Sequence, residues 1–334
     1  MTQKTSWAER YFNEREFDVG SPEALCEALE SGTEGLRELM LDSLVPRSSR
    51  FPNSLPGQGD DIFDLFFRGQ INSSWGISSS LQRFSGARHE AELAEAERRV
   101  IDEMRDHGLG LNATDGQLLM MLQHHSIPTR LIDVSTSPQP ALFFAAEKED
   151  QRDGRLFVIG LPHYEGRDAP YFDAVQLSSE DLPWDGAAKG KQRSSSDWTK
   201  RIALVEEVPI DPRMMAQEGR FLVGGLIKRY AGENPMTVDK GEEVPIECWP
   251  EVTSLNLFFP KKTAKPAVRP PALGWSIRIK ATWKPKLREW LQNREDSISE
   301  ESIYPKFIEC ERIGKGAAEG RVDPRQKAQD DLAA

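Results

Sequence analysis

The sequence predicts an α+β fold, and three observations support that prediction. Residues 62–70 are rich in Ile, Leu and Phe, a composition typical of a strand. Residues 89–107 carry apolar side chains at the spacing of an amphipathic helix. Residues 118–146 combine a helix, a strand and a second helix in close succession. The strand between those two helices also concentrates polar side chains, which makes it the candidate centre of the protein.

Composition limits the possible size and class of the protein. The chain has 334 residues and 38% hydrophobic residues, enough for one large domain or for a domain with an appendage. A net charge of -11 excludes a protein whose whole surface attracts nucleic acid. Its 3 cysteines lie far apart and predict neither a disulfide framework nor a metal site. No signal core and no apolar run of about 18 residues occur, so we expect a cytoplasmic protein without membrane contact.

The first part of the chain predicts helices followed by a strand. Residues 1–44 are expected to form a helical lead-in, and residues 45–61, rich in Pro, Ser and Gly, a loop. Arg68 ends the aromatic strand and is followed by Gly69. A charge at this place indicates either a bound ligand or a salt bridge at the sheet rim, and glycine allows a ligand or another backbone to approach.

The helix at 89–107 is predicted to turn its acidic side chains to solvent. Its apolar face consists of Leu93, Val100, Ile101 and Met104. The opposite, mostly solvent-facing side consists of Glu90, Glu92, Glu95, Glu97, Arg98 and Asp102.

The central stretch predicts a second helix, capped by Thr114 or Asp115 and ended by Pro128. His124 and His125 then lie at its C-terminal end. A strand-like run follows from Thr129. Its alternation places Thr129, Leu131, Asp133 and Ser135 on one face and Arg130, Ile132 and Val134 on the other.

A third helix is predicted after this strand, with Ser137 as its N-cap and Pro138 at its first position. Between residues 129 and 137 the chain thus carries a carboxylate, an arginine and several hydroxyls. Buried polar groups must be paired, so this concentration favours a site. The alternatives are local roles, with Asp133 and Ser137 satisfying turn or cap amides and Arg130 held in a buried ion pair.

Later elements are predicted more simply. We expect strands at 155–160 and 255–259, a polar loop leading into a strand within 211–225, an edge strand at 275–281 and a helix at 284–292, with an insertion at about 162–200 and a disordered tail at 311–334. Basic residues recur from Lys261 to Arg288 with no acidic residue among them. They form either a solvated edge or a phosphate-binding patch.

Four stretches in this order resemble the FRG domain family. They are Phe67-Arg68-Gly69-Gln70, the signature from Gln123-His124 to Pro138 with Ala141-Leu142-Phe143-Phe144-Ala145 after it, Arg213 to Phe221, and Ile277 to Phe307 closing on Glu301-Ser302-Ile303-Tyr304-Pro305. The resemblance runs from about Ser21 to Phe307 and gives an FRG domain at 45–310. The chain departs from the family pattern at Ser126, Val134 and Ser135.

The order of elements in this family is similar to the split β-sheet of ADP-ribosyltransferases. That likeness implies roles for individual residues, with NAD as substrate and no metal. The candidate catalytic residues are Arg68, His124, Ser135, Gln217 and Glu218. The candidate NAD-binding residues are Arg68, Gly69, Gln70, Thr129, Arg130, Asp133, Ser135, Thr136 and Ser137.

The leading hypothesis is an ADP-ribosyltransferase-like bacterial effector of the toxin–antitoxin or phage-defence type. It would modify a nucleic acid or a protein, with an antitoxin or regulatory partner as a further expectation. A carboxylate beside the ribose would stabilise the oxocarbenium-like state. Two alternatives stay open. One is a non-catalytic nucleotide-sensing or protein-interaction domain, and the other is an NAD-independent RNA-directed enzyme using His124, His125 and Arg130 on phosphates.

Overall fold

The structure of the chain is a computed structural model. It describes residues 5–30, 63–162, 171–172, 177, 181–182, 184–185, 198, 202–205, 219–228, 235–261 and 272–304. The predicted loop at 45–61, the tail at 311–334, Gln217, Glu218 and most of the 162–200 insertion lie outside these residues.

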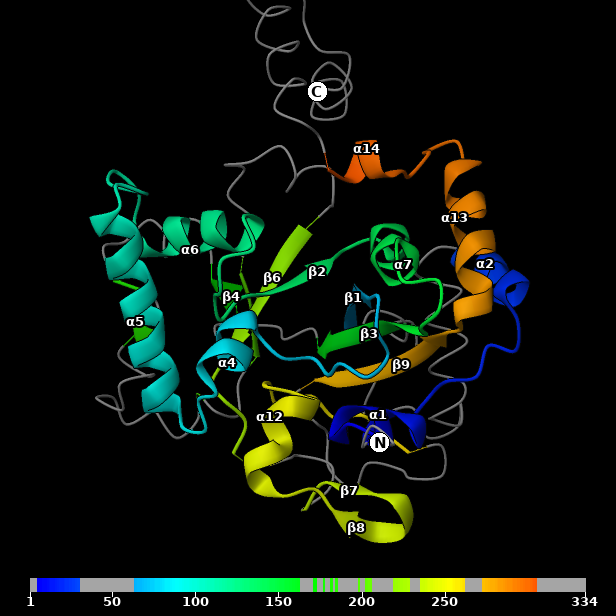
Figure 1. Ribbon diagram of the computed structural model, residues 1–334, viewed down its shortest axis with the longest axis horizontal. Coiled ribbons are helices and arrows are strands. Elements are labelled where there is room, and N and C mark those ends of the chain that lie inside the picture. Colours follow the sequence, from blue (N-terminus) through cyan, green and yellow to red (C-terminus); the bar gives the residue numbers. More distant parts are fainter. Residues whose placement is uncertain are drawn as a thin grey trace, which may run out of the picture.

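The described fold is α+β, as predicted, and is built on one sheet of mostly antiparallel strands (Figure 1). The strand order is β4-β5-β6-β2-β1-β3-β9, and the short β4 joins β5 in parallel at one edge. The bounds are β1 Phe63–Gln70, β2 Ile132–Ser135, β3 Gly154–Pro162, β4 Tyr171–Phe172, β5 Ile202–Val205, β6 Gly219–Gly224 and β9 Leu273–Ile279. A separate hairpin pairs β7 Thr237–Val238 with β8 Glu242–Glu243.

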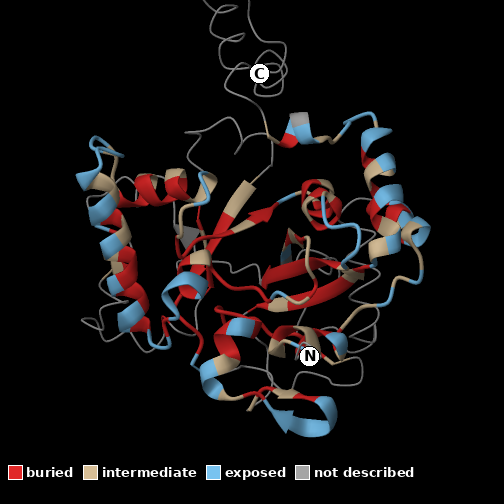
Figure 2. Cartoon of the chain, viewed as in Figure 1, coloured by how far each residue is buried: buried red, intermediate tan, exposed pale blue. Residues whose placement is uncertain are grey.

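Helices cover both faces of this sheet. On one face, α1 (Trp7–Asn13) and α12 (Trp249–Val252) contribute to a core with side chains of β1, β2, β3 and β6. On the other, α2 (Pro22–Glu30), α7 (Pro138–Ala146) and α13 (Lys284–Gln292) enclose a second core, which α14 (Glu300–Ile303) extends. Figure 2 shows buried residues concentrated in the sheet and on the helix sides that face it. The described part of the predicted lead-in, residues 5–30, is therefore part of the core, since Tyr11 and Phe12 are fully buried, and residues 1–4 and 31–44 lie outside the described residues.

The remaining helices pack beside β5 and β6. They are α4 (Ser80–Ser85), α5 (Glu90–Asp106) and α6 (Asp115–His124). The side chain of Thr114 caps α6 as predicted, in a capping box with Gln117. Helix α7 begins at Pro138 with Ser137 at the N-cap position, as predicted, but the Ser137 hydroxyl donates to Gln139 Oε1 and makes no capping hydrogen bond.

Strands β1 and β2 diverge within the sheet. Strand β1 pairs with β3 along its whole length, from Phe63 to Gln70, and all four residues of β2 pair with β6. Yet β1 and β2 share one residue pair, Phe67 with Ser135. The two strands therefore diverge immediately beyond this pair, where Arg68 and Asp133 lie.

The strand prediction at 255–259 is wrong. This segment makes one isolated bridge, between Phe258 and Leu273, and otherwise runs as irregular backbone. Leu255, Leu257, Phe258 and Phe259 are all buried, because the segment lies against the core and has no solvent-facing side. The edge strand predicted at 275–281 is confirmed as β9, which begins two residues earlier.

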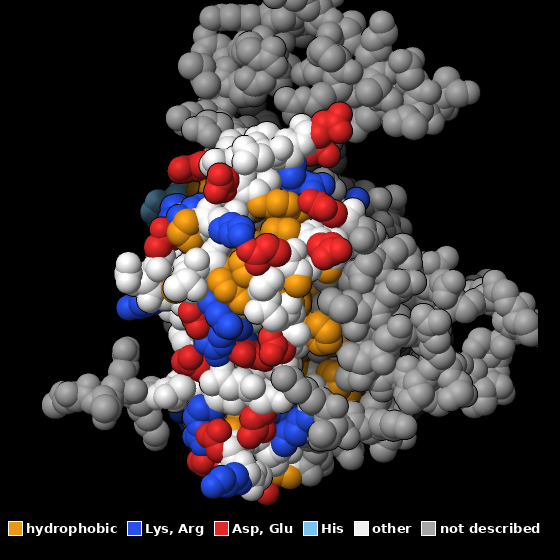
Figure 3. All heavy atoms as spheres, turned by 90° about the vertical axis from the view of Figure 1, so that its right-hand side faces the viewer, with side chains coloured by type: hydrophobic (Ala, Val, Ile, Leu, Met, Phe, Trp, Pro, Cys, Tyr) orange, Lys and Arg blue, Asp and Glu red, His pale blue; other side chains and the backbone are white. Residues whose placement is uncertain are grey.

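Most described basic residues between Lys261 and Arg288 are paired within the protein. Arg278 contacts Glu16 and Asp153, Arg288 contacts Asp150, and the fully buried Lys284 donates to backbone carbonyls. Figure 3, which faces this side of the molecule, shows basic and acidic side chains interspersed. The arrangement favours the solvated, ion-paired edge over a phosphate-binding patch.

Substituting Gly69 by alanine should destabilise the protein. A Cβ at this position would lie 1.7 Å from the Ala141 carbonyl oxygen and 2.7 Å from the Ala145 nitrogen, both in the backbone of α7. Overpacking against backbone should cost about 3 kcal/mol, the upper part of the usual range. Urea unfolding of Gly69→Ala measures this cost, and Asp64→Ala, on an exposed position of the same strand, is the control. Equal stability of the two variants would contradict the prediction.

Candidate functional site

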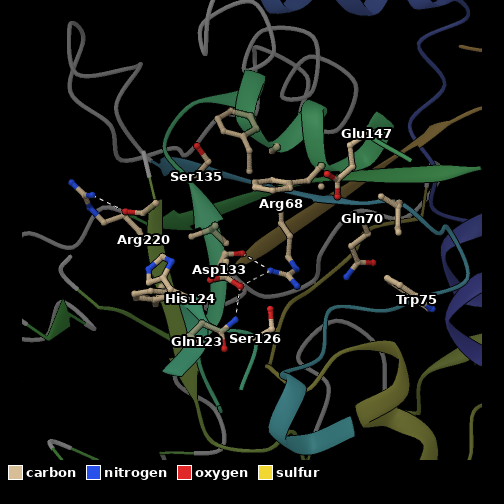
Figure 4. A pocket seen from close by; sticks show the side chains of 18 of the residues that line it. Arg68, Gln70, Trp75, Gln123, His124, Ser126, Asp133, Ser135, Glu147 and Arg220 are labelled. Atoms are coloured by element: carbon tan, nitrogen blue, oxygen red, sulfur yellow. Dashed lines mark hydrogen bonds and ion pairs between the residues drawn. The ribbon is translucent and has the colours of Figure 1, made fainter. Parts of the chain in front are cut away.

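A cavity of about 460 Å³ lies where β1 and β2 diverge. Its walls come from the end of β1, from β2, from the start of β6, from the end of α6 and from α7 (Figure 4). Its lining residues are Phe67, Arg68, Gly69, Gln70, Ile71, Trp75, Arg83, Gln123, His124, Ser126, Asp133, Val134, Ser135, Ala141, Phe144, Glu147, Gly219, Arg220, Phe221 and Tyr304.

Arg68 bridges the gap between the two strands. Its Nη1 donates to the Asp133 carbonyl oxygen at 2.7 Å and lies 3.7 Å from Asp133 Oδ2. Its buried Nε has no hydrogen-bond partner among the described residues. Burial lowers the pKa of this guanidinium, and the nearby Asp133 opposes that effect. Arginine stays protonated in proteins, so the group is a positive charge with a free donor in the cavity wall.

Arg83 of α4 brings a second guanidinium to the same cavity. Its Nη1 donates to the Ser78 carbonyl oxygen, which is uncharged. Burial lowers the pKa of Arg83, and the positive charge of Arg68 lowers it further. Two cations that repel each other, the half-buried Arg68 and the exposed Arg83, line this cavity with Asp133 as the carboxylate that acts on both, an arrangement that favours the binding of an anion between them.

Polar and aromatic groups lie on both sides of Arg68. Figure 4 shows His124, Ser135 and Arg220 on one side and Gln70, Trp75 and Glu147 on the other. The His124 ring packs edge-on against Phe221, with 5.6 Å between ring centroids. The cavity thus has a cationic middle and two chemically distinct ends.

A hydrogen-bond chain fixes the carboxylate of Asp133. Thr129 Oγ1 donates to Gln123 Oε1 at 2.5 Å, and Gln123 Nε2 donates to Asp133 Oδ2 at 2.5 Å. Thr129 is fully buried and does not line the cavity. Its role in the described structure is therefore to orient Gln123, which in turn holds Asp133 in the cavity wall.

Arg130 lies in a buried ion-pair cluster. Its Nη1 contacts Glu90 at 2.5 Å and its Nε contacts Glu97 at 3.1 Å. The indole nitrogens of Trp184 and Trp198 donate to the same two carboxylates. Burial lowers the pKa of Arg130, but Glu97 and Glu90 outweigh that effect and raise it. The structure thus shows the buried ion pair that the sequence analysis gave as the alternative role of Arg130, and Arg130 does not line the cavity.

The predicted solvent exposure of Glu90 and Glu97 is therefore wrong. Glu90 is 6% exposed and Glu97 3% exposed. Helical spacing explains the error, because Glu97 follows Leu93 by four residues and precedes Ile101 by four, which places it on the apolar face, and Glu90 lies on the same side. Glu92 and Glu95 lie on the other side of the helix and stay exposed.

The structure brings most of the other predicted site residues to the cavity. Gln70, Asp133 and Ser135 line it, as do Arg68 and His124. Gly69 lines it too, although the contact that requires glycine is with α7. Thr136, Ser137 and His125 do not line it, and Ser137 donates its backbone N–H to Ser135 Oγ at 3.1 Å. Gln217 and Glu218 lie outside the described residues; Gly219, the next residue, lines the cavity.

Several lining residues were not among the predicted site residues, and four of them bring a charge or an aromatic ring from other parts of the chain. Trp75 and Arg83 occur in a serine-rich segment after the strand predicted at 62–70, and their aromatic ring and charge were the signals present. Glu147 and Tyr304 come from the ends of α7 and α14, and the Tyr304 hydroxyl donates to Glu147 Oε2 at 3.2 Å. This contact joins residues far apart in the chain, which no local pattern reveals.

Metal and membrane signals are absent from the part of the chain that the structure describes. No group of three or more His, Cys, Asp or Glu side chains there is arranged to hold a metal ion. None of the helices in the same residues has the length and apolar character needed to span a bilayer.

The fold and cavity define an α+β domain with a pocket, lined by Arg68 and Arg83, at the place where β1 and β2 diverge. The family model of the FRG domain matches residues 64–154, from β1 to the start of β3. The resemblance seen in the sequence is thus confirmed for the stretch that contains Arg68, His124, Asp133 and Ser135. No curated protein and no solved structure matches the chain.

Proposed function

We propose that the cavity binds NAD and that the protein is an ADP-ribosyltransferase-like bacterial effector. The observation that carries this proposal is the convergence of Arg68 and Arg83 on one cavity. Two guanidinium groups suit a pyrophosphate, since each offers a planar set of donors to phosphate oxygens. The distinct ends of the cavity suit the two nucleoside halves of a dinucleotide.

The chain order of the lining elements supports the finer fold proposal. An arginine on β1, hydroxyl residues at the end of β2, and a Gln–Glu pair before β6 follow the order of the split-sheet ADP-ribosyltransferase fold. In the described structure Ser135 pairs with Phe67 on one side and with Gly219 on the other. Arg68, Ser135 and the residue after Glu218 therefore lie within reach of one ligand.

The proposed reaction breaks the bond between nicotinamide and ribose C1′. Nicotinamide leaves with the bonding electron pair, and a nucleophilic atom of a nucleic acid or protein bonds to C1′ and loses a proton. A carboxylate near C1′ stabilises the positive charge that develops on the ribose. Glu218 is the proposed carboxylate, with Gln217, Ser135 and His124 as its candidate companions. Asp133 is less suited, because Gln123 and Arg68 already bind it.

Of the two alternatives, the nucleotide-sensing domain keeps support. The same cationic cavity would bind a nucleotide without chemistry if no carboxylate reaches the ribose. The RNA-directed enzyme has less support, because its three proposed residues do not lie together. Arg130 is buried in its ion-pair cluster, and His125 is exposed and does not line the cavity. A role in phage defence and an antitoxin or regulatory partner remain part of the proposal and rest on the family resemblance. The cytoplasmic location remains an expectation from the sequence, which has no signal core and no long apolar run.

Transfer of label from adenine-labelled NAD into a cell lysate tests the function. Wild type should label a macromolecule and Arg68→Ala should not, and digestion with nuclease or protease then identifies the acceptor class. Wild-type protein that is folded but neither transfers label nor releases nicotinamide would refute the transferase. Binding of NAD without turnover would instead support the nucleotide-sensing domain.

Replacing Arg83 by alanine should weaken ADP-ribose binding about 10-fold, since a charge-assisted hydrogen bond contributes about 1.5–3 kcal/mol. Isothermal titration measures the affinity. The control is Arg88→Ala, which removes a charge from an exposed residue just before α5 that does not line the cavity. An Arg83 variant that binds like wild type would show that this guanidinium does not contact the ligand.

A further inference from the structure

One end of the cavity has features that an anion site does not need. Trp75 lines the cavity and is 48% exposed, one of the few large apolar side chains in the described residues with so much surface in solvent. Gln70 lines the same cavity, is 5% exposed, and its Oε1 has no hydrogen-bond partner among the described residues. Figure 4 shows both side chains on the same side of Arg68.

The loop that carries Trp75 is held firmly. Gln70 Nε2 donates to the Gly76 carbonyl oxygen at 2.9 Å and so closes the loop. Ser73 N donates to the Asp153 carbonyl oxygen at 2.7 Å, and Arg155 Nε donates to the Ser73 carbonyl oxygen at 3.1 Å. Gly76 lies so close to α12 that a Cβ would be 2.1 Å from the Glu251 carbonyl oxygen.

This anchoring bears on the exposure of Trp75. A flexible loop could bury the indole by rearranging, whereas these contacts fix the backbone on both sides of it. Preorganised exposure of an aromatic ring beside cationic groups is what a stacking site for a heterocycle requires.

The anchoring also fixes the orientation of the Gln70 amide. Because Nε2 donates to a carbonyl oxygen, a flip of the amide would set two acceptors against each other. Oε1 is therefore the acceptor that remains. An unpaired buried acceptor costs free energy, which a ligand N–H donor would recover.

We propose that Trp75 and Gln70 form a subsite for a planar nitrogen heterocycle that carries an amino or carboxamide NH₂ group. The ring stacks on the Trp75 indole, and the NH₂ group donates to Gln70 Oε1. This inference rests on the proposed function, since the phosphates of the same ligand bind Arg68 and Arg83. NAD offers two such groups, the adenine amine and the nicotinamide carboxamide.

Titration with five probes separates these possibilities: inorganic pyrophosphate, ADP, inosine diphosphate, nicotinamide mononucleotide and nicotinic acid mononucleotide. Wild type should bind the NH₂-bearing nucleotide of the matching pair more tightly than its partner that lacks NH₂. A preference within the adenine pair assigns the subsite to adenine, and a preference within the nicotinamide pair assigns it to nicotinamide.

Trp75→Ala should weaken binding of the preferred nucleotide at least about 5-fold, the low end of base–aromatic stacking, while pyrophosphate affinity stays unchanged. Gln70→Leu should abolish the preference for NH₂ within the pair. Phe84→Ala, which removes a 78% exposed ring outside the cavity wall, is the matched control. Circular dichroism checks that each variant is folded.

The subsite is overturned if wild type binds pyrophosphate but binds no nucleotide more tightly, or if both Trp75→Ala and Gln70→Leu leave the nucleotide affinities and preference intact. Those outcomes would still be consistent with an anion site at Arg68 and Arg83. Failure of folded wild-type protein to bind any probe, pyrophosphate included, would refute the proposed function as well.

Discussion

Replacing Arg68 by lysine should lower the affinity for ADP-ribose about 100-fold, and replacing it by alanine should abolish measurable binding. Arg68 reaches the Asp133 carbonyl oxygen through one nitrogen and keeps a free Nε in the cavity wall. Lysine preserves the charge but has a single nitrogen and no planar fork, so it cannot offer separate nitrogens in a fixed geometry to Asp133 and to a phosphate. Loss of such a buried charged contact typically costs about 2–5 kcal/mol.

Isothermal titration of the three proteins with ADP-ribose tests this expectation. Because Arg68 also bridges β1 and β2, thermal unfolding must accompany the binding measurement. Arg220→Lys is a useful control, since Arg220 lines the same cavity on the other side of Arg68 but its Nη1 donates to the neighbouring Gly219 carbonyl oxygen. An Arg68→Lys variant that is folded and retains wild-type affinity would remove Arg68 from the ligand site.

Local sequence rules predicted the elements around the cavity well. The helix ended by Pro128, the strand that ends at Ser135 and the helix that begins at Pro138 are all present. Their ends depend on proline and on capping residues, which act within a few positions. The strand itself begins at Ile132, three residues later than expected, because the Thr129 side chain bonds to Gln123 and to the Leu131 backbone.

Contacts between distant residues were beyond such rules. Glu90 and Glu97 lie on the apolar side of α5 by helical spacing, but the sequence does not show that Arg130, 33 to 40 residues away, pairs with them. The apolar segment at 255–259 reads as a strand, yet it lies against the core without strand pairing. Arg83 enters the site because α4 places it beside Arg68, and its serine-rich sequence surroundings give no sign of that contact.

Replacing Arg130 by methionine should destabilise the fold by about 3–5 kcal/mol, the usual cost of removing one partner of a buried ion pair. Glu90 and Glu97 would keep their indole donors but lose the charge that compensates them. Burial already raises the pKa of Glu97. Urea unfolding measures the loss. Arg99→Met is the control, because its pair with Glu95 on the same helix is exposed and should contribute at most about 0.5 kcal/mol.

Changing Glu90 and Glu97 to glutamine in the Arg130→Met background should restore part of the lost stability. Amide oxygens still accept from Trp184 and Trp198, and no buried charge then remains in the cluster. A loss below about 1 kcal/mol in Arg130→Met, or no recovery in the triple variant, would contradict a structural role based on charge compensation.

The same variant decides between the two roles that the sequence left open for Arg130. The residue precedes β2 by two positions, and β2 carries Asp133 and Ser135 into the cavity. If Arg130 bound the cofactor, ADP-ribose affinity would fall as it does for Arg68, even where the variant is fully folded. The buried cluster predicts the opposite, with affinity close to wild type well below the unfolding temperature and a lower unfolding temperature. Binding and unfolding therefore separate in Arg130→Met, whereas the Arg68 substitutions should change binding far more than stability.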